Sequence, residues 1–192
     1  HDLEQIQPLV VVLPVGPNRG MYSHKVALPI EGSIQVGDRR YEATPDRCFA
    51  ILDIHKAHYP RHTWWNWATC AGRDAEGRLI GLNLTHNVAK DEERLNENGL
   101  WIDGELHHLG PARFEFDKQR VLEPWRLTTT DGAVDVHFEP AGERCDDIDI
   151  GPIRSVFHQP YGRFAGTVKL PGGDVVTLED LYGVCEDHDA KW

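Results

Sequence analysis

The densest group of chemically versatile side chains lies between residues 52 and 62 and contains Asp53 and His55. A spacing of two residues on a strand points both side chains to the same face. A carboxylate beside an imidazole can act as a general acid/base pair, because it orients the ring and favours its charged form. The same two groups could supply ligands to a metal ion. The alternative is a strand end that runs into a polar loop with exposed histidines, His58 and His62 among them.

Three tryptophans surround Asn66 in the segment Trp64-Trp65-Asn66-Trp67. On a strand, Trp65 and Trp67 would share one face, and Trp64 and Asn66 the other. Such aromatic residues can line a ligand pocket or form the floor of a hydrophobic core. A buried Asn66 would need a hydrogen-bond partner, which could be a ligand or neighbouring backbone.

Polar residues also interrupt later apolar segments at Asn83, Glu97 and Asn98. A Glu97 side chain facing inward would be costly to bury unless it were paired or protonated. We therefore consider Asp53 and Glu97 as candidate catalytic carboxyl groups. The alternative for Glu97 is the shoulder of a hairpin, in which Asn98 caps a turn.

Further polar and aromatic residues stand near expected strand ends, where each could face a pocket or be an ordinary surface group. The predicted ligand-binding set comprises His24, Lys25, Trp65, Asn66, Trp67, Asn83, Asn98, Trp101, His158 and Glu186. An alternative set of metal ligands comprises His24, His55, Glu186 and His188. The sequence contains no nucleophile elbow, phosphate-binding glycine loop, zinc-protease motif or dinucleotide fingerprint, so no cofactor is predicted.

Short strands would position these residues. The 12 prolines and 18 glycines separate segments rich in β-branched and aromatic residues, which is typical of strands. Tight turns predict hairpins at Gly37-Asp38, Asp103-Gly104, Asp131-Gly132 and Gly172-Gly173. Further strands are expected at 9–13, 25–28, 49–53, 63–70, 79–84, 113–116 and 153–158, and short helices at 90–95 and 178–181. The pattern predicts an all-β antiparallel meander that closes into a barrel or folds into a sandwich.

Composition sets the class of protein. The chain has 192 residues, 40% of them hydrophobic, which supports one core. We interpret residues 1–21 as an N-terminal extension or linker strand and 22–192 as the domain. The net charge of −11 argues against binding to nucleic acid. No apolar run approaches the length of about 18 residues expected of a transmembrane helix.

The four cysteines, Cys48, Cys70, Cys145 and Cys185, stand far apart and form no Cys-x-x-Cys pair. We expect free, largely buried thiols in a reducing compartment, and hence a cytoplasmic location. Two disulfides are the alternative.

Several short motifs, taken in order, resemble one protein family. They are Tyr22-Ser23-His24-Lys25, Glu31-Gly32 with Tyr41, Phe49-Ala50-Ile51-Leu52-Asp53, Trp65-Asn66-Trp67-Ala68, Gly81-Leu82-Asn83-Leu84, Glu97-Asn98 with Trp101 and Asp103-Gly104, Pro124-Trp125-Arg126, His158-Gln159, Tyr161-Gly162-Arg163-Phe164-Ala165-Gly166, and Gly183, Glu186 and Trp192. From Tyr22 to Trp192 the chain resembles the bacterial family catalogued as domain of unknown function 2804. Members of that family are usually longer, so the resemblance makes a missing N-terminal half of the same protein a candidate partner.

Two segments depart from the family pattern. After Asp53 the family often reads Trp-Gly-Arg-Gly, where this chain has Ile54-His55-Lys56-Ala57, so no family role carries over to His55. Near the end, Ala190-Lys191 stands where the family often has Asn and Arg before the final Trp. The family is similar to lipocalin-like (calycin) barrels such as carotenoid 1,2-hydratase, which implies a barrel that holds a hydrophobic or amphipathic molecule.

The leading functional hypothesis is a domain that binds a small hydrophobic or amphipathic ligand. One alternative is a lyase, hydratase or isomerase that acts on an unsaturated ligand by carboxylate acid/base chemistry. Another is a metal-stabilised or interaction domain, half of a two-barrel protein, which would expose an apolar face.

Overall fold

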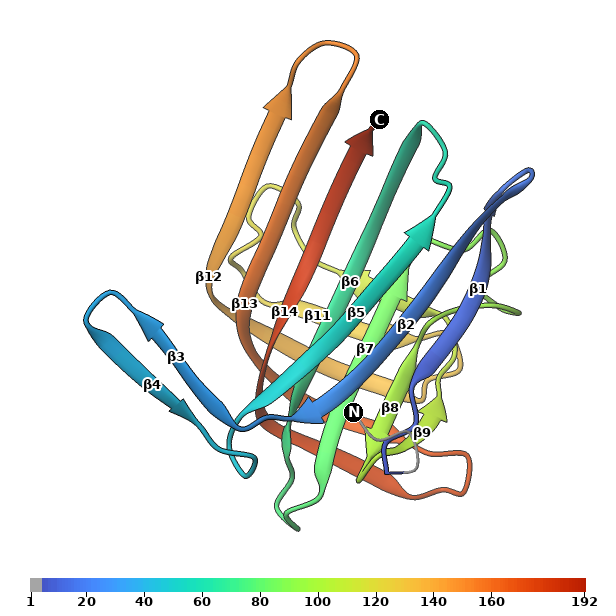
Figure 1. The fold of residues 1–192 in the computed structure, drawn as a ribbon. Helices are drawn as coiled ribbons and strands as arrows, with labels where there is room; N and C mark the ends of the chain where they lie inside the picture. Colours follow the sequence, from blue (N-terminus) through green and yellow to red (C-terminus); the bar gives the residue numbers. More distant parts are fainter. Residues whose placement is uncertain (1–4) are drawn as a thin grey trace.

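The computed structural model describes residues 5–192, which form fourteen strands and no helix (Figure 1). The strands are β1 (Leu9–Gly16), β2 (Arg19–Pro29), β3 (Gly32–Val36), β4 (Arg39–Ala43), β5 (Phe49–Ala57), β6 (His62–Arg73), β7 (Leu79–His86), β8 (Gly99–Ile102), β9 (Glu105–His108), β10 (Ala112–Glu115), β11 (Trp125–Thr129), β12 (Val134–Asp149), β13 (Arg154–Lys169) and β14 (Val175–Lys191). Every pairing is antiparallel. All four predicted hairpin turns join neighbouring strands.

Nine strands form one large sheet in the order β10-β11-β12-β13-β14-β6-β7-β8-β9. It consists of two meanders, β6 to β9 and β10 to β14, which the pairing of β14 with β6 joins. The sheet curls until β10 contacts β7 across the core. The predicted all-β antiparallel meander is therefore confirmed as a half-barrel.

The hydrophobic core fills the inside of this curl. In β12 the side chains of Val134, Val136 and Phe138 are buried while the residues between them are exposed, which is the alternation of a strand with one face on the core. Trp125 is fully buried and stacks on Phe116 with ring centroids 3.7 Å apart. Each such large side chain contributes about 1.5–3 kcal/mol when fully buried.

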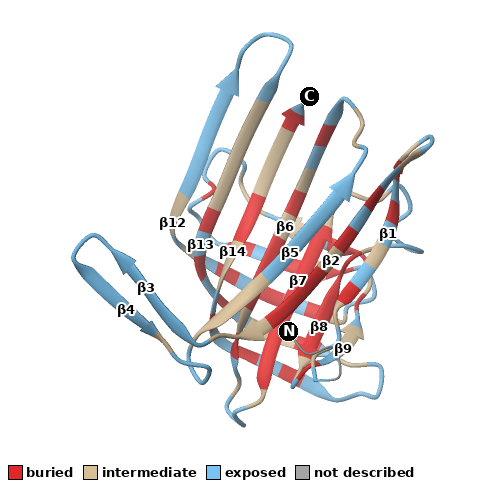
Figure 2. Ribbon diagram, in the orientation of Figure 1, coloured by how far each residue is buried: buried red, intermediate tan, exposed pale blue. Residues whose placement is uncertain are grey.

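The long strands β12, β13 and β14 bend sharply where they leave the core (Figure 1). Gly162 and Gly183 pair with each other within β13 and β14, and a Cβ atom on either would overlap backbone of the neighbouring strand. In β12, side chains before the bend alternate between buried and exposed, and the part of the strand beyond the bend is mostly exposed (Figure 2). Pro140 and Pro160 lie inside β12 and β13, although prolines were expected to separate strands.

A second sheet, in the order β1-β2-β5, covers β6 and β7. Ala27 of β2 approaches Gly81 of β7 so closely that a Cβ at Gly81 would collide with it. The β3–β4 hairpin projects from this layer with both strands exposed (Figure 2). The domain boundary expected before Tyr22 falls within β2.

The two expected helices are wrong. Leu178 and Leu181 both face the core because a bulge inserts an extra residue into β14, opposite Phe164 and Gly166 of β13. Asp180 adopts a positive φ of 58° at this bulge. A bulge shifts the period of a strand by one residue, so the spacing imitated a helix. Residues 90–95 form turns, with Leu95 N–H donating to the carbonyl of Asp91 at 2.9 Å.

All four cysteines are free thiols. Cys70 and Cys185 are buried, as expected, whereas Cys48 is half-buried and Cys145 is exposed. Burial raises the pKa values of the Cys70 and Cys185 thiols. Between residues 5 and 192, no helix is long and apolar enough to span a membrane.

Candidate functional site

A chamber of about 130 Å³ lies between the two sheets. We call it the polar chamber, and it is lined by Lys25, Asp53, His55, Tyr59, Trp65, Trp67, Thr85, Val88, Glu97 and Glu186. The small sheet contributes a cation, a carboxylate and an imidazole from its inner face, and the large sheet contributes aromatic and acidic side chains. Three carboxyl groups therefore converge in one small space.

Strand register explains how the large sheet supplies its part. Trp67 of β6 pairs with Glu186 of β14 on one side and with Thr85 of β7 on the other. Residues directly opposite each other in an antiparallel pair project from the same face. Trp65 and Trp67 share that face, as the sequence predicted.

Lys25 is the central cation of the polar chamber, and its side chain is only 1% exposed. Its Nζ donates to Asp53 Oδ2 at 2.7 Å and lies 3.5 Å from Glu97 Oε1. The same ammonium lies 5.1 Å from the centre of the Trp67 ring, within the range of a cation–π interaction. A buried ammonium requires such partners, because its transfer from water is costly.

Asp53 and His55 point to the same face of β5, as the spacing predicted, with His55 Nε2 3.0 Å from Asp53 Oδ1. Burial raises the pKa of Asp53, but hydrogen bonds from His55 and Lys25 and the charge of Lys25 outweigh that effect, so the pKa is lowered. Asp53 is therefore an ionised carboxylate that orients an imidazole.

Glu97 is buried, with 1% of its side chain exposed. Thr85 Oγ1 donates to Glu97 Oε1 at 2.8 Å. Its other oxygen, Oε2, is buried and accepts no hydrogen bond from residues 5–192. His55 Nε2 lies 3.8 Å from that oxygen, which is too long for a hydrogen bond. Glu97, which lines the polar chamber, thus has one oxygen without a hydrogen-bond partner among the described residues.

The Glu186 carboxyl group has different hydrogen-bond donors from those of Asp53. Trp65 Nε1 donates to its Oε1 at 2.7 Å, and Gln159 Nε2 donates to its Oε2 at 2.9 Å. Burial raises the pKa of this carboxyl group despite those two hydrogen bonds. Burial, together with the charges of Glu97 and Asp53, also raises the pKa of Tyr59 to about 12.

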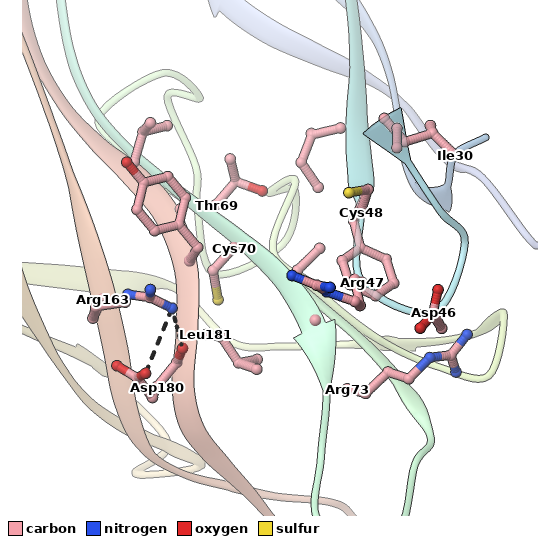
Figure 3. A pocket seen from close by; sticks show the side chains of 18 of the residues that line it. Ile30, Asp46, Arg47, Cys48, Thr69, Cys70, Arg73, Arg163, Asp180 and Leu181 are labelled. Carbon is pink, nitrogen blue, oxygen red and sulfur yellow. Dashed lines mark hydrogen bonds and ion pairs between the residues drawn. The ribbon is translucent and has the colours of Figure 1, made fainter. Parts of the chain in front are cut away.

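A larger groove of about 1010 Å³ shares a lining residue with the polar chamber, and Figure 3 shows this groove from close by. Trp67 lines both spaces, and Gln159, which lines the groove, donates to Glu186 in the polar chamber. These two residues lie between the small polar chamber and the larger groove.

The walls of the groove come from separate parts of the chain. Ile30, Arg47 and Cys48 lie on one side, and Arg163 and Asp180 lie on the other (Figure 3). Two of its arginines are tethered to backbone: Arg163 Nη1 donates to the Asp180 carbonyl at 3.0 Å, and Arg73 Nη2 to the Pro45 carbonyl at 3.1 Å. The groove is therefore lined both by apolar side chains and by charged side chains of either sign.

The structure brings half of the twelve predicted catalytic and ligand-binding residues together. The polar chamber is lined by both predicted catalytic carboxyl groups and by four predicted ligand-binding residues, namely Asp53, Glu97, Lys25, Trp65, Trp67 and Glu186. Asn83 supports it from behind, since Trp67 Nε1 donates to Asn83 Oδ1 at 2.8 Å and Asn83 Nδ2 donates to the Glu97 carbonyl at 2.6 Å.

Besides Asn83, five predicted ligand-binding residues do not line the polar chamber. His24 lies on the outer face of β2 beside Tyr22, while Asn66 and His158 lie on the opposite face of the large sheet. Asn98 accepts from the Thr85 N–H at 2.6 Å and donates to the Gly110 carbonyl at 2.8 Å. Trp101 is buried and donates to the Gln7 carbonyl at 2.7 Å.

The alternative metal set is dispersed across the fold. His24 lies on the outer face of the small sheet, and His188 bonds to Ser155 and packs against Trp65. His55 and Glu186 line opposite walls of the polar chamber. Among residues 5–192, the metal-capable side chains that converge in a group of three are Glu143, Cys145 and His158.

Sequence reasoning did not assign Tyr59 or Thr85 to the site. Neither carries a local signal, because Thr85 reaches the site through strand register and Tyr59 through its stacking on Trp65, at 6.0 Å between ring centroids. Val10, Val12 and Ile54 are exposed on the outer face of the small sheet.

The fold and this arrangement define an antiparallel β half-barrel with a polar chamber beside an open groove. The chain belongs to the family described as Domain of unknown function (DUF2804), whose model matches residues 1–192. No curated protein matches the chain, and no solved structure matches it.

Proposed function

We propose that this domain binds a small amphipathic molecule, with a polar end in the polar chamber and an apolar part along the groove. The observation that carries the proposal is the buried Glu97 carboxylate, whose Oε2 accepts no hydrogen bond from the described residues. Buried polar atoms in native proteins are almost always paired, so an acceptor without a hydrogen bond on a residue that lines a cavity favours recognition of a ligand donor. A hydroxyl or amine group would satisfy it.

The sizes of the two spaces support this division of the ligand. The polar chamber, at about 130 Å³, is comparable to an engineered cavity of about 150 Å³ that holds benzene. It therefore fits one end of a larger molecule. The groove, at about 1010 Å³, lies at the upper end of typical ligand-pocket volumes, about 300–1,000 Å³. Trp67 would contact both parts of the ligand.

Native mass spectrometry of the freshly purified protein tests this proposal. We expect a non-covalent adduct on the wild type that leaves on denaturation. Trp67→Ala should lose the adduct, because the shared wall is removed. Trp64→Ala is the matched control, since Trp64 lies on the same strand but on the opposite face. A bare polypeptide mass for the wild type, or an adduct that both variants retain equally, would contradict the proposal.

A second candidate function is acid/base catalysis on an unsaturated ligand by a lyase, hydratase or isomerase. The observation that favours it is the opposite shift of two carboxyl pKa values in one chamber: that of Glu186 is raised and that of Asp53 is lowered. Such divergence separates a proton donor from a base. In a hydration, the Glu186 carboxyl would give its proton to a ligand carbon. Water would then add to the cation, and its proton would pass to Asp53 or His55.

Incubation of the released adduct with the protein distinguishes the two functions. A hydratase or lyase changes the ligand mass by one water, and an isomerase changes its chromatographic retention at constant mass. A Glu186→Gln variant should abolish either change while it still binds the ligand. Recovery of an unaltered ligand after long incubation with the wild type would leave binding alone.

A further inference from the structure

Three metal-capable side chains converge on the face of the large sheet that is opposite to the polar chamber. They are Glu143 and Cys145 of β12 and His158 of β13. One ligand atom from each lies within 4.8 Å of the other two. They are the one group of three or more such side chains among residues 5–192 that meets this distance.

Strand register creates this convergence. Cys145 is the direct partner of His158, and Glu143 precedes Cys145 by two residues, so all three project from one face. His158 Nδ1 lies 3.0 Å from Glu143 Oε2, which fixes the imidazole beside the carboxylate. The neighbouring residue Gln159 projects to the other face, where it bonds to Glu186. The group is therefore separate from the polar chamber.

We propose that Glu143, Cys145 and His158 bind a single borderline-soft divalent cation of the Zn²⁺ type. One thiolate, one imidazole and one carboxylate are the ligand types that Zn²⁺ takes, and three protein ligands leave a fourth position for water. Zn²⁺ bonds of about 2.0–2.3 Å place tetrahedral ligand atoms roughly 3.4 Å apart. The observed separations need only a small inward movement of side chains. On binding, the Cys145 thiol loses its proton to solvent and its sulfur bonds the metal.

The surroundings favour a cation without adding another ligand. Asp187 is the partner of His158 on β14, and its negative charge extends the acidic character of this face. Its carboxylate is already held by Asn66 Nδ2 at 2.8 Å and Lys118 Nζ at 3.1 Å. Cys145 is the exposed thiol of the chain, so a metal ion can reach it directly.

Titration with Co²⁺ in a non-thiol reductant, followed by displacement with Zn²⁺, tests the site. We expect one Co²⁺ per chain, with a thiolate-to-cobalt charge-transfer band and the visible absorption of a tetrahedral ion. Cys145→Ala should abolish the charge-transfer band. Glu143→Gln and His158→Gln should each weaken Zn²⁺ binding at least about tenfold, as loss of even a supporting group at a metal site does.

Cys48→Ala is the matched control, because Cys48 is the other thiol that is not fully buried. It should retain the band and the affinity. Far-UV circular dichroism confirms that each variant is folded. The absence of a charge-transfer band in the wild type, or a Zn²⁺ affinity that Cys145→Ala leaves unchanged, would overturn the proposal.

Discussion

Replacement of Lys25 by Met should destabilise the fold because it leaves two carboxylates without their cation. Lys25 is 1% exposed, and its Nζ lies 2.7 Å from Asp53 and 3.5 Å from Glu97. Removal of one partner from a buried ion pair typically costs about 3–5 kcal/mol. Because the Asp53 side chain is 24% exposed, solvent screens part of its charge, and we expect the lower end, about 3 kcal/mol.

Urea unfolding at neutral pH measures this loss directly. In a thermal scan, about 3 kcal/mol corresponds to a decrease in Tm of roughly 6–12 °C for a chain of this size. The lowered pKa of Asp53 sets the pH dependence. Its stabilising contribution is fully present above the ordinary value of 3.8 and is lost as the pH falls through the lower folded value. The gap between Lys25→Met and wild type should therefore narrow below pH 3.8.

Lys56→Met is the matched control, because Lys56 is exposed on the same small sheet. It should change the free energy of unfolding by less than about 0.5 kcal/mol. If Lys25→Met costs less than about 1 kcal/mol, or no more than Lys56→Met, then Lys25 does not balance buried carboxylates and the reasoning fails.

Three further predictions follow from single groups. Burial raises the pKa of Glu186 above 4.5, so the wild type loses stability relative to Glu186→Gln as the pH rises through that pKa. Urea unfolding across this pH range should show the free energy of unfolding of the variant rising relative to that of the wild type. A difference that does not depend on pH would refute the prediction. Gly183→Ala should lower the free energy of unfolding by about 3 kcal/mol or more, because the added Cβ atom overlaps the Thr69 carbonyl. Gly172→Ala should be nearly neutral, because Gly172 lies in open space. Equal unfolding midpoints of the two variants would refute this prediction. Spectrophotometric titration should show a tyrosinate step near pH 12 that Tyr59→Phe removes, and an unchanged curve would count against the buried position of Tyr59.

Local patterns predicted much of the secondary structure, because turn chemistry and side-chain alternation are local properties. Asp103 and Gly104 both adopt positive φ, at 48° and 91°, as the tight hairpin turn requires. Alternation likewise placed Asp53 with His55, and Trp65 with Trp67. The bulge near Asp180 could not be predicted from local patterns, because a bulge depends on how the strand pairs with its partner.

The composition of the site was only partly predictable for a similar reason. Lys25 and Glu97 were both candidates, but they meet only because the β1-β2-β5 sheet packs over β6 and β7. Asn66 and His158 were assigned to the pocket, yet the strand register turns both to the opposite face. That register also places His158 beside Cys145, a pairing between strands that no spacing in the sequence reveals.

Calorimetric titration of the released adduct into Glu97→Gln tests the proposed role of Glu97 most directly. A hydrogen bond to a charged group contributes about 1.5–3 kcal/mol, so loss of the Glu97 charge should raise Kd at least about tenfold. Glu93→Gln, which changes an exposed acid nearby, should bind like the wild type. An unchanged Kd for Glu97→Gln would contradict the claim that its unpaired oxygen receives the ligand.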